Sequence, residues 1–239
     1  MNFRNIFFAT FFFNLLYNTL LCQIPTINLK GWYTIDSIVL SSGYITQMYD
    51  MSGHGLHAVQ GLQGLQPLLV GDALNGHPSA RFDGNDVLNT PPFGGGTAEV
   101  FLVARGDEFG NQYLGLGQGY HVNFMGSLNP ILYLDGSCYR YFSPQQPHGE
   151  YQLHHFGFSG GTAAAATTFL EVNGVSLAPG GGMDGGGVVL GDLKVGGGTL
   201  RGEILELIVY DTLLGDSARG AVSAYLSAKY APAVELGGN

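Results

Sequence analysis

The sequence predicts an all-β fold, a two-sheet antiparallel β-sandwich with one short C-terminal helix. Glycine supplies 39 of the 239 residues, more than twice the average of about 7%, and without a Gly-X-Y period this favours tight turns over collagen. Short β-prone runs follow one another every 8–12 residues or so between Gly, Asn and Pro, as in sandwiches and barrels. Hydrophobic residues make up 45% of the chain, which is enough for a core and argues against disorder.

Short strands are expected through most of the chain. The run at 97–105 alternates around Val100 and Leu102 after a Pro-Pro-Phe-Gly-Gly-Gly turn. Asn173-Gly174 is the strongest hairpin signal, because both residues tolerate positive φ. The other runs that we expect to be strands are 111–116, 121–125, 131–134, 151–158, 167–172, 175–177, 188–190 and 203–210.

One segment has the period of a helix. Asp216 can cap a helix that runs to about Ala231, with Val222, Leu226 and Tyr230 four residues apart on one stripe. We expect this helix to dock on the sandwich. Residues 23–239 contain no linker and no long repeat, so they are expected to form a single domain.

Residues 1–22 have the composition of a secretory signal peptide. Arg4 and the amino terminus form a short positive region, and the uncharged run at 6–22 is mostly apolar. A spanning helix needs about 20 apolar residues, more than this run supplies, so we expect cleavage of the segment, and a retained membrane anchor is the alternative. We therefore expect a secreted or cell-surface protein, with no membrane span after signal removal.

The two cysteines leave three alternatives open. Cys22 either leaves with the signal peptide, is lipidated as the first residue of the mature chain, or pairs with Cys138 in an uncleaved chain. A lone cysteine in a secreted protein suggests burial or intermolecular pairing. Burial of Cys138 is the expectation.

The charge balance excludes some partners. Charged residues are 11% of the chain and the net charge is −9, whereas a soluble domain carries about 25% charged residues. Only nine basic residues are present, which argues against nucleic acid or an anionic membrane as a partner. Sparse charge also leaves few repulsions between copies, so self-association stays open.

Four segments, taken in order, carry a family resemblance. They are 32–37 (WYTIDS), 49–58 (YDMSGHGLHA), 81–88 (RFDGNDVL) and 202–211 (GEILELIVYD). Together they resemble the laminin-G-like domains of bacterial secreted and surface proteins, in the concanavalin A-like lectin/glucanase superfamily, over residues 32–230. The resemblance implies a jelly-roll sandwich whose relatives bind sugars, bind proteins or build surface structures. It is specific for fold and not for function.

The region 113–151 is the candidate ligand-binding region. It mixes tyrosines with amide side chains, as sugar-binding faces do, because sugar rings stack on aromatic faces and need hydrogen-bond partners. The same mixture suits any half-exposed strand, since Tyr favours sheets. The candidate ligand-binding residues are Tyr113, Tyr120, Tyr133, Tyr139, Tyr141, Gln118 and Asn123.

Calcium is the one cofactor for which the sequence offers ligands. Asp50 lies in the D-x-S-G turn, and Asp83 and Asp86 lie in the F-D-G-x-D turn. The resemblance implies that a structural calcium is frequent, and such a hard cation takes six to eight oxygens. The alternative is that each Asp hydrogen-bonds the amides of its own turn.

No catalytic residue is predicted. Glu203 and Glu206 are the nearest carboxylate pair, but three positions apart on a strand they are expected to point to opposite faces, whereas retaining glycosidases hold two carboxyls about 5–5.5 Å apart. We expect a non-catalytic binding or adhesion module for carbohydrate or a cell-surface protein. The alternatives are a structural subunit of an extracellular filament or layer, and a glycosidase or lyase of the same fold.

Overall fold

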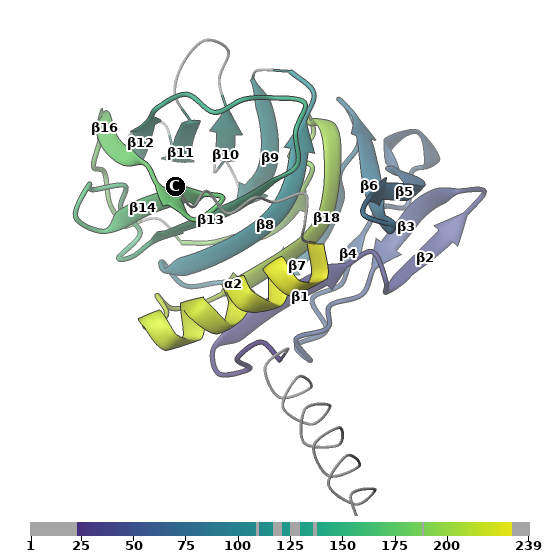
Figure 1. Cartoon of the computed structure of the whole chain (residues 1–239), viewed down its shortest axis with the longest axis horizontal. Coiled ribbons are helices and arrows are strands. Elements are labelled where there is room, and N and C mark those ends of the chain that lie inside the picture. The colour runs from purple at the N-terminus through teal and green to yellow at the C-terminus, as the bar shows by residue number, and fades with distance from the viewer. Residues whose placement is uncertain are drawn as a thin grey trace, which may run out of the picture.

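The computed structural model describes residues 23–108, 110–116, 121–124, 130–135, 138–187 and 189–230. These residues form two packed layers of antiparallel strands with one α-helix, so the predicted β-sandwich is confirmed (Figure 1).

The layer beneath the helix, here the helix-side sheet, is built around the ten-residue strand β18 (Arg201–Tyr210). Strand β8 (Ala98–Gly106) pairs along one side of β18. Along the other side, β6 (His77–Asp83) and then β1 (Leu29–Thr34) pair with successive halves of β18. Beyond β8 the sheet continues through β13 (Gln152–Phe158), β14 (Thr168–Val172) and β15 (Val175–Ser176).

The second layer, here the opposite sheet, runs from β4 to β16. Its strands, in spatial order, are β4 (Ala58–Val59), β7 (Leu88–Pro92), β17 (Asp192–Val195), β9 (Asn111–Leu116), β10 (His121–Phe124), β11 (Pro130–Asp135), β12 (Cys138–Ser143) and β16 (Ala178–Met183).

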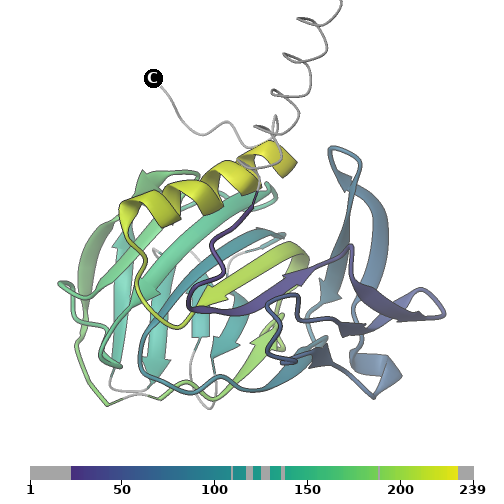
Figure 2. The same ribbon diagram turned by 90° about the horizontal axis from the view of Figure 1, so that it is seen from below.

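Three N-terminal strands lie at the other end of the molecule from β12, β14 and β16 (Figures 1 and 2). They are β2 (Ile38–Ser41), β3 (Tyr44–Met48) and β5 (Leu68–Leu74), with the short 3₁₀ helix η1 (Gln63–Leu65) before β5. Strand β3 pairs with both β4 and β5, and so connects the two layers by hydrogen bonds.

The main hydrophobic core fills the space between the two sheets. Alternate residues of each strand face it, for example Val100 and Leu102 from β8 and Leu132 and Leu134 from β11. This alternation is the period of two that a half-buried strand imposes on its side chains. The core therefore also fixes which side chains point outward from each sheet.

Helix α2 (Asp216–Tyr230) packs on the outer face of the helix-side sheet, as Figure 2 shows. The predicted stripe of Val222, Leu226 and Tyr230 is buried, and each apolar side chain so buried contributes about 1.5–3 kcal/mol. The strand residues in this second hydrophobic cluster are Leu29, Leu74, Phe101, Val103, Leu153, Leu205, Ile208 and Tyr210.

The hairpin expected at Asn173-Gly174 is present. Strands β14 and β15 pair across it, and both turn residues have positive φ, 51° and 76°. This is the combination that the two-residue hairpin turn requires.

The prediction of a strand at 188–190 is wrong. Val189 and Leu190 lie outside any strand, and the pairing in this part of the chain is made instead by β16 and by β17. β16 has the sequence APGGGM, which carries almost no β propensity. It pairs with the edge of β12 through its backbone, so hydrophobic patterning could not reveal it.

Candidate functional site

Three of the predicted tyrosines form a cluster on the outward face of the opposite sheet. On β12 the half-buried Tyr139 and Tyr141 alternate with buried residues that face the core. Tyr133 on β11 pairs directly with Tyr139, and Ile131 pairs with Tyr141. The rings of Tyr133 and Tyr139 lie 5.9 Å apart with planes 16° from parallel, and those of Tyr139 and Tyr141 lie 5.5 Å apart at 80°. Adjacent strands thus present one continuous aromatic surface, the tyrosine cluster.

The other predicted ligand residues do not join this cluster in the described structure. Tyr113 is only 5% exposed and its ring packs against His154 between the sheets, with ring centroids 5.2 Å apart. Asn123 pairs with Ile131 through the backbone of β10 and β11, and its side chain lies outside the described structure. Gln118 and Tyr120 also lie outside the described residues.

A second candidate surface crosses the outer face of the helix-side sheet. The strand register places Tyr44 opposite Leu68, Leu68 opposite Arg81, Arg81 opposite Glu203, and Glu203 opposite Arg105. Paired residues of neighbouring strands share a face, and strands lie about 4.8 Å apart. Side chains from five strands therefore form one row across the sheet, which begins with an aromatic residue and carries charged residues on its last three strands.

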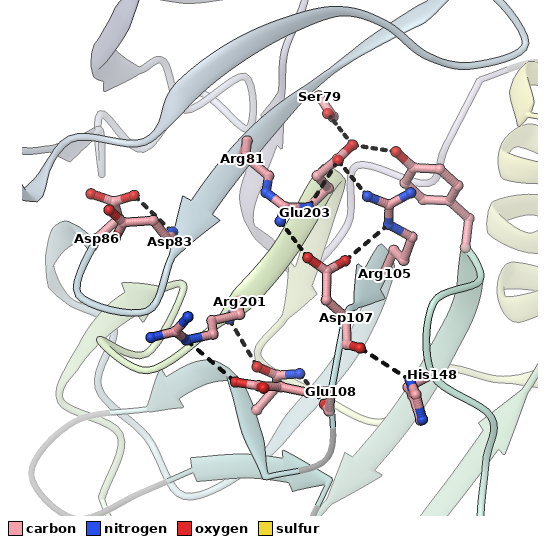
Figure 3. A network of polar contacts seen from close by, with 12 residues as sticks. Ser79, Arg81, Asp83, Asp86, Arg105, Asp107, Glu108, His148, Arg201 and Glu203 are labelled. Atoms are coloured by element: carbon pink, nitrogen blue, oxygen red, sulfur yellow. Dashed lines mark hydrogen bonds and ion pairs between the residues drawn. The ribbon is translucent and has the colours of Figure 1, made fainter.

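Glu203 lies at the centre of the charged part of this row, between Arg81 and Arg105 (Figure 3). Its Oε2 accepts hydrogen bonds from the hydroxyls of Ser79, at 2.7 Å, and Tyr151. Its Oε1 accepts from Arg105 at 2.7 Å and from Arg81 at 3.3 Å. Glu203 itself is 5% exposed. A buried carboxylate is tolerated only when it is paired and hydrogen-bonded, and here four donors meet that requirement.

Asp107 closes the same network on its solvent side. Its carboxylate pairs with both Arg81 and Arg105, and its backbone oxygen lies 3.0 Å from Nδ1 of His148 (Figure 3). The two arginines thus share two carboxylates, and the four charges balance. The arrangement is typical of a structural ion-pair network.

The prediction that Glu203 and Glu206 point to opposite faces is wrong. Ile204 pairs with Ala104 and Glu206 pairs with Val103, so one extra residue is inserted in β18 at Leu205. Such a bulge shifts the alternation by one, and both glutamates then lie on the outer face.

The two glutamates nevertheless belong to separate networks. Glu206 has no exposed surface, and it accepts hydrogen bonds from Trp32 Nε1 at 2.7 Å, Tyr230 OH at 2.7 Å and Lys229 Nζ at 2.9 Å. Each carboxylate is saturated by its own donors. Glu206 ties β18 to β1 and to the end of α2.

A pocket of about 490 Å³ lies at the aromatic end of the row. It is lined by Tyr44, Gln63, Gly64, Gln66, Leu68, Arg81, Asp83 and Asp86. Two of these, Asp83 and Asp86, were predicted from the sequence as cation ligands. The turn that follows β6 brings them together, because Asp86 Oδ2 accepts the backbone N–H of Asp83 at 3.0 Å and Asp83 Oδ1 accepts that of Asn85 at 3.2 Å.

Burial raises the pKa of the Asp86 carboxyl to about 6, and the neighbouring charge of Asp83 adds to the effect. The side-chain oxygen of Gln66 is buried in the same pocket wall without a hydrogen-bond partner. The Gln66 amide nitrogen, by contrast, donates to the backbone oxygen of Gln60 at 2.8 Å.

Asp50 fills a structural role in its turn. Its carboxylate accepts the backbone N–H groups of Trp32, Ser52 and Leu56, at 3.1, 2.9 and 3.0 Å. Burial alone would raise the pKa of Asp50, but these hydrogen bonds outweigh burial and lower it. Asp50 therefore follows the alternative to calcium binding that the sequence left open, in which the carboxylate hydrogen-bonds the amides of its own turn. Among the described residues, no group of three or more His, Cys, Asp and Glu side chains is placed to hold a metal ion.

Sequence reasoning missed most of the pocket. Tyr44 and Gln66 belong to none of the four motifs, and Arg81, which opens the RFDGNDVL segment, was not predicted as a site residue. They meet because β5 pairs with both β3 and β6. The one usable signal was the acidic pair in the F-D-G-x-D turn.

No protein-family model matches the sequence, and neither does any curated protein. Solved structures do match. Domain 4 of AbnA, a GH43 extracellular arabinanase from Geobacillus stearothermophilus in complex with arabinotriose, aligns with a TM-score of 0.57 and 14% identity over 83% of this chain and 97% of that one.

Two other similar structures belong to longer proteins. Trypanosoma rangeli sialidase, in complex with a difluorinated nononic acid, aligns with a TM-score of 0.52 and 12% identity over 90% of this chain, but only 34% of the sialidase. The botulinum neurotoxin type G receptor binding domain aligns with a TM-score of 0.52 and 9% identity over 84% of this chain and 51% of that one. At these identities the matches show the fold. Within the described part of the chain, no helix is both long and apolar enough to cross a bilayer.

Proposed function

We propose that this protein is a non-catalytic carbohydrate-binding module, exported from the cell, and that it binds glycans on the tyrosine cluster. The observation that carries the proposal is the arrangement of Tyr133, Tyr139 and Tyr141, whose rings adjoin on one outward face. Aromatic faces pack against the C–H faces of sugar rings, and each tyrosine adds a hydroxyl that can donate or accept. The arabinotriose complex of AbnA domain 4 supports the sugar class.

We also propose that the chain is a laminin-G-like domain of the concanavalin A-like superfamily, because the four motifs occur in the order that this family has. Two of these motifs have a physical role that supports the assignment. Asp50 of the second motif organises its own turn, and Glu206 of the fourth holds β18 to α2.

The non-catalytic part of the proposal is supported by the state of the two glutamates. Glu203 and Glu206 use their oxygens to accept hydrogen bonds from protein donors, and neither is more than 5% exposed. A general acid or nucleophile must reach the bond that it attacks. Measuring hydrolysis of arabinan, glucan and sialylated substrates tests this, and turnover that is lost in Glu203→Gln would contradict it.

The binding proposal is tested by affinity electrophoresis on a panel of soluble plant, algal and bacterial polysaccharides. Tyr139→Ala removes the central ring of the cluster, and we expect affinity for the best glycan to fall about two- to twelvefold, since one aromatic contact is worth about 0.5–1.5 kcal/mol. Tyr139→Phe should keep most of the stacking.

Tyr49→Ala is the matched control, because Tyr49 is a tyrosine that is 40% exposed and lies outside the tyrosine cluster and outside the pocket described above. Equal losses in Tyr49→Ala and Tyr139→Ala, or no retardation of the parent protein by any glycan, would contradict binding at the tyrosine cluster.

A second candidate function is a self-assembling surface subunit. It is favoured by exposed apolar side chains on the N-terminal strands, of which Leu40 is 45% and Leu68 42% exposed. Strand β2 pairs with β3 along one side, and no described strand pairs with its other side. Such an edge can accept a strand from another molecule. Sedimentation at rising concentration tests this, with Leu40→Lys expected to abolish any oligomer.

A further inference from the structure

The pocket beside η1, β5 and β6 has features that sugar binding at the tyrosine cluster does not use. It lies on the helix-side sheet, and its volume of about 490 Å³ is within the range of small-molecule sites. It combines two carboxylates, an amide oxygen and an aromatic ring within one wall. The chemistry of these groups identifies the kind of ligand that would fit.

Gln66 is the first indication of a ligand. It is 6% exposed, and its amide nitrogen is held by the backbone oxygen of Gln60. That bond holds the side-chain amide of Gln66, a residue that lines the pocket, and its oxygen has no hydrogen-bond partner. A buried acceptor left unsatisfied costs about 1–3 kcal/mol, so the site favours a ligand that brings a donor.

Asp83 and Asp86 add acceptors of the same kind. The turn after β6 holds them side by side, and each accepts one backbone amide of that turn (Figure 3). Asp86 is 6% exposed. Ionised carboxylates are acceptors only, so Asp83, Asp86 and Gln66 bring more acceptor oxygens to the pocket than the two that the amides of the turn occupy.

The positively charged side chain in the pocket wall, that of Arg81, is already paired with two carboxylates. Arg81 pairs with Glu203 and with Asp107, on the side of β6 away from the Asp83–Asp86 turn (Figure 3). With Arg81 neutralised in this way, the two carboxylates dominate the pocket. The net charge of the whole chain, −9, has the same sign, and such a field attracts cations.

We propose that this pocket binds a primary ammonium group, that of a deacetylated amino sugar, through the oxygens of Gln66, Asp83 and Asp86. An ammonium has three N–H donors and no acceptor, which complements three acceptors. Tyr44 and Leu68 form the apolar part of the wall, and the face of a tyrosine ring also attracts a cation. The sugar identity rests on the proposed function, whereas the ammonium chemistry rests on the pocket alone.

The pocket suits an organic cation better than calcium. A calcium ion takes six to eight oxygens in a compact shell, and the acidic groups here are two. A volume of about 490 Å³ is also far larger than one ion occupies and leaves room for a sugar ring.

Binding at this site should depend on pH. Asp86 has a pKa of about 6, raised by burial and by Asp83. The other charged groups around this turn are Arg81 on β6 and Arg201 on β18, whose side chain packs on Gly84. A cationic ligand binds the ionised form of Asp86, so affinity should fall as the pH drops through about 6.

The proposal is tested by titrating the full chain with glucosamine, glucose and N-acetylglucosamine at about pH 7, followed by NMR shifts or calorimetry. We expect glucosamine to bind at least tenfold more tightly than glucose or N-acetylglucosamine, and to weaken at about pH 5. Nα-acetyl-lysine amide serves as a second source of a primary ammonium. Binding of both amines supports the ammonium site, and binding of glucosamine alone supports the amino sugar.

Two variants locate the site. Asp86→Asn keeps the shape of the turn and should reduce glucosamine affinity tenfold or more without lowering the melting temperature. Gln66→Leu should reduce it as well, and its melting curve reports whether the fold survives. Tyr139→Ala, on the other sheet, should leave glucosamine binding unchanged.

Several outcomes would overturn the proposal. Equal affinity for glucose and glucosamine would show that no ammonium is recognised, and undiminished binding in Asp86→Asn would place the ligand elsewhere. Calcium that binds with one-to-one stoichiometry and displaces glucosamine would make this a metal site. If the parent protein binds a polysaccharide at the tyrosine cluster but does not bind glucosamine, this inference is overturned and the proposed function stands.

Discussion

The imidazole of His155 lies between two carboxylates, with Nε2 2.8 Å from Glu99 Oε1 and Nδ1 2.8 Å from Glu171 Oε2. Its ring also stacks on Phe101, with centroids 4.1 Å apart and planes 7° from parallel. Glu99 has no exposed surface and accepts in addition from Arg219, at 2.7 Å, on the first turns of α2. This cluster joins the start of the helix to β8, β13 and β14.

The cluster should make stability depend on the protonation of His155. Burial lowers the pKa of His155, but the hydrogen bonds to Glu171 and Glu99 outweigh it and raise the pKa overall. The charged form therefore stabilises the fold fully below the unfolded pKa of about 6.5, and this contribution is lost as the pH rises through the higher folded value. We expect His155→Gln to cost about 1–3 kcal/mol at pH 6 and less at pH 9, by urea unfolding.

The difference between parent and variant is the quantity to measure, because His154 acts in the opposite sense. Burial lowers the pKa of His154 to about 3, so the folded protein keeps this side chain neutral where the unfolded chain can protonate it. The free energy of unfolding therefore falls as the pH drops below about 6.5. The exposed His148 lies outside this cluster, and His148→Gln is the control for the replacement of a histidine by glutamine. A cost of His155→Gln that grows with pH would contradict the charged pair.

Local signals in the sequence were sufficient for much of the fold. Asn173 and Gly174 predicted their hairpin because positive φ is a property of those residues, and Val222, Leu226 and Tyr230 predicted the buried face of α2 because the spacing repeats along one element. The bulge at Leu205 could not be predicted, since it depends on how β18 pairs with β8.

The candidate sites also contain residues that a local sequence pattern predicts and residues that only the tertiary structure brings together. Tyr139 and Tyr141 alternate along one strand, so a short window of sequence carries the signal. Tyr113 lies in an equally tyrosine-rich stretch, but packing against His154 in the core decides its burial. Gln66 enters the pocket only through strand pairing across distant segments, and its unpartnered oxygen depends on the bond to Gln60.

Gly174 should resist substitution because of its backbone. Its φ of 76° lies in the left-handed region, where a side chain costs about 1–2 kcal/mol. We expect Gly174→Ala to lower the unfolding free energy by that amount, as measured by urea denaturation. Gly181 is the control, because its φ is not in that region and a Cβ there would meet nothing within 4 Å. Equal costs at both positions would contradict the assignment of strain to the turn.

The hydroxyl of Tyr230 should contribute to the docking of α2. It donates to Glu206 Oε2 at 2.7 Å, and both residues are buried. Tyr230→Phe removes one donor from a carboxylate that has no access to water, so we expect a loss of about 1.5–3 kcal/mol in unfolding free energy. Tyr49→Phe, at a residue 40% exposed, should change stability little. A Tyr230→Phe variant as stable as the parent would mean that Trp32 and Lys229 satisfy Glu206 alone.

Cys138 should be unreactive in the native protein. Its side chain has no exposed surface, its Sγ accepts the N–H of Ala163 at 3.0 Å, and it lies 3.0 Å from the backbone oxygen of Asp184. A disulfide reagent reaches a buried thiol only after local or global opening, so native modification should be roughly a hundredfold or more slower than in denaturant.

The rate of thiol modification, followed spectroscopically with and without urea, measures this difference, and Cys138→Ser identifies the signal that belongs to Cys138. Rapid modification of the native protein would contradict the buried position. Slow modification would also separate burial of Cys138 from pairing between chains, because an interchain disulfide through Cys138 requires β12 to open first. Any self-association of this protein would then depend on the exposed apolar side chains of β2 and β5 instead.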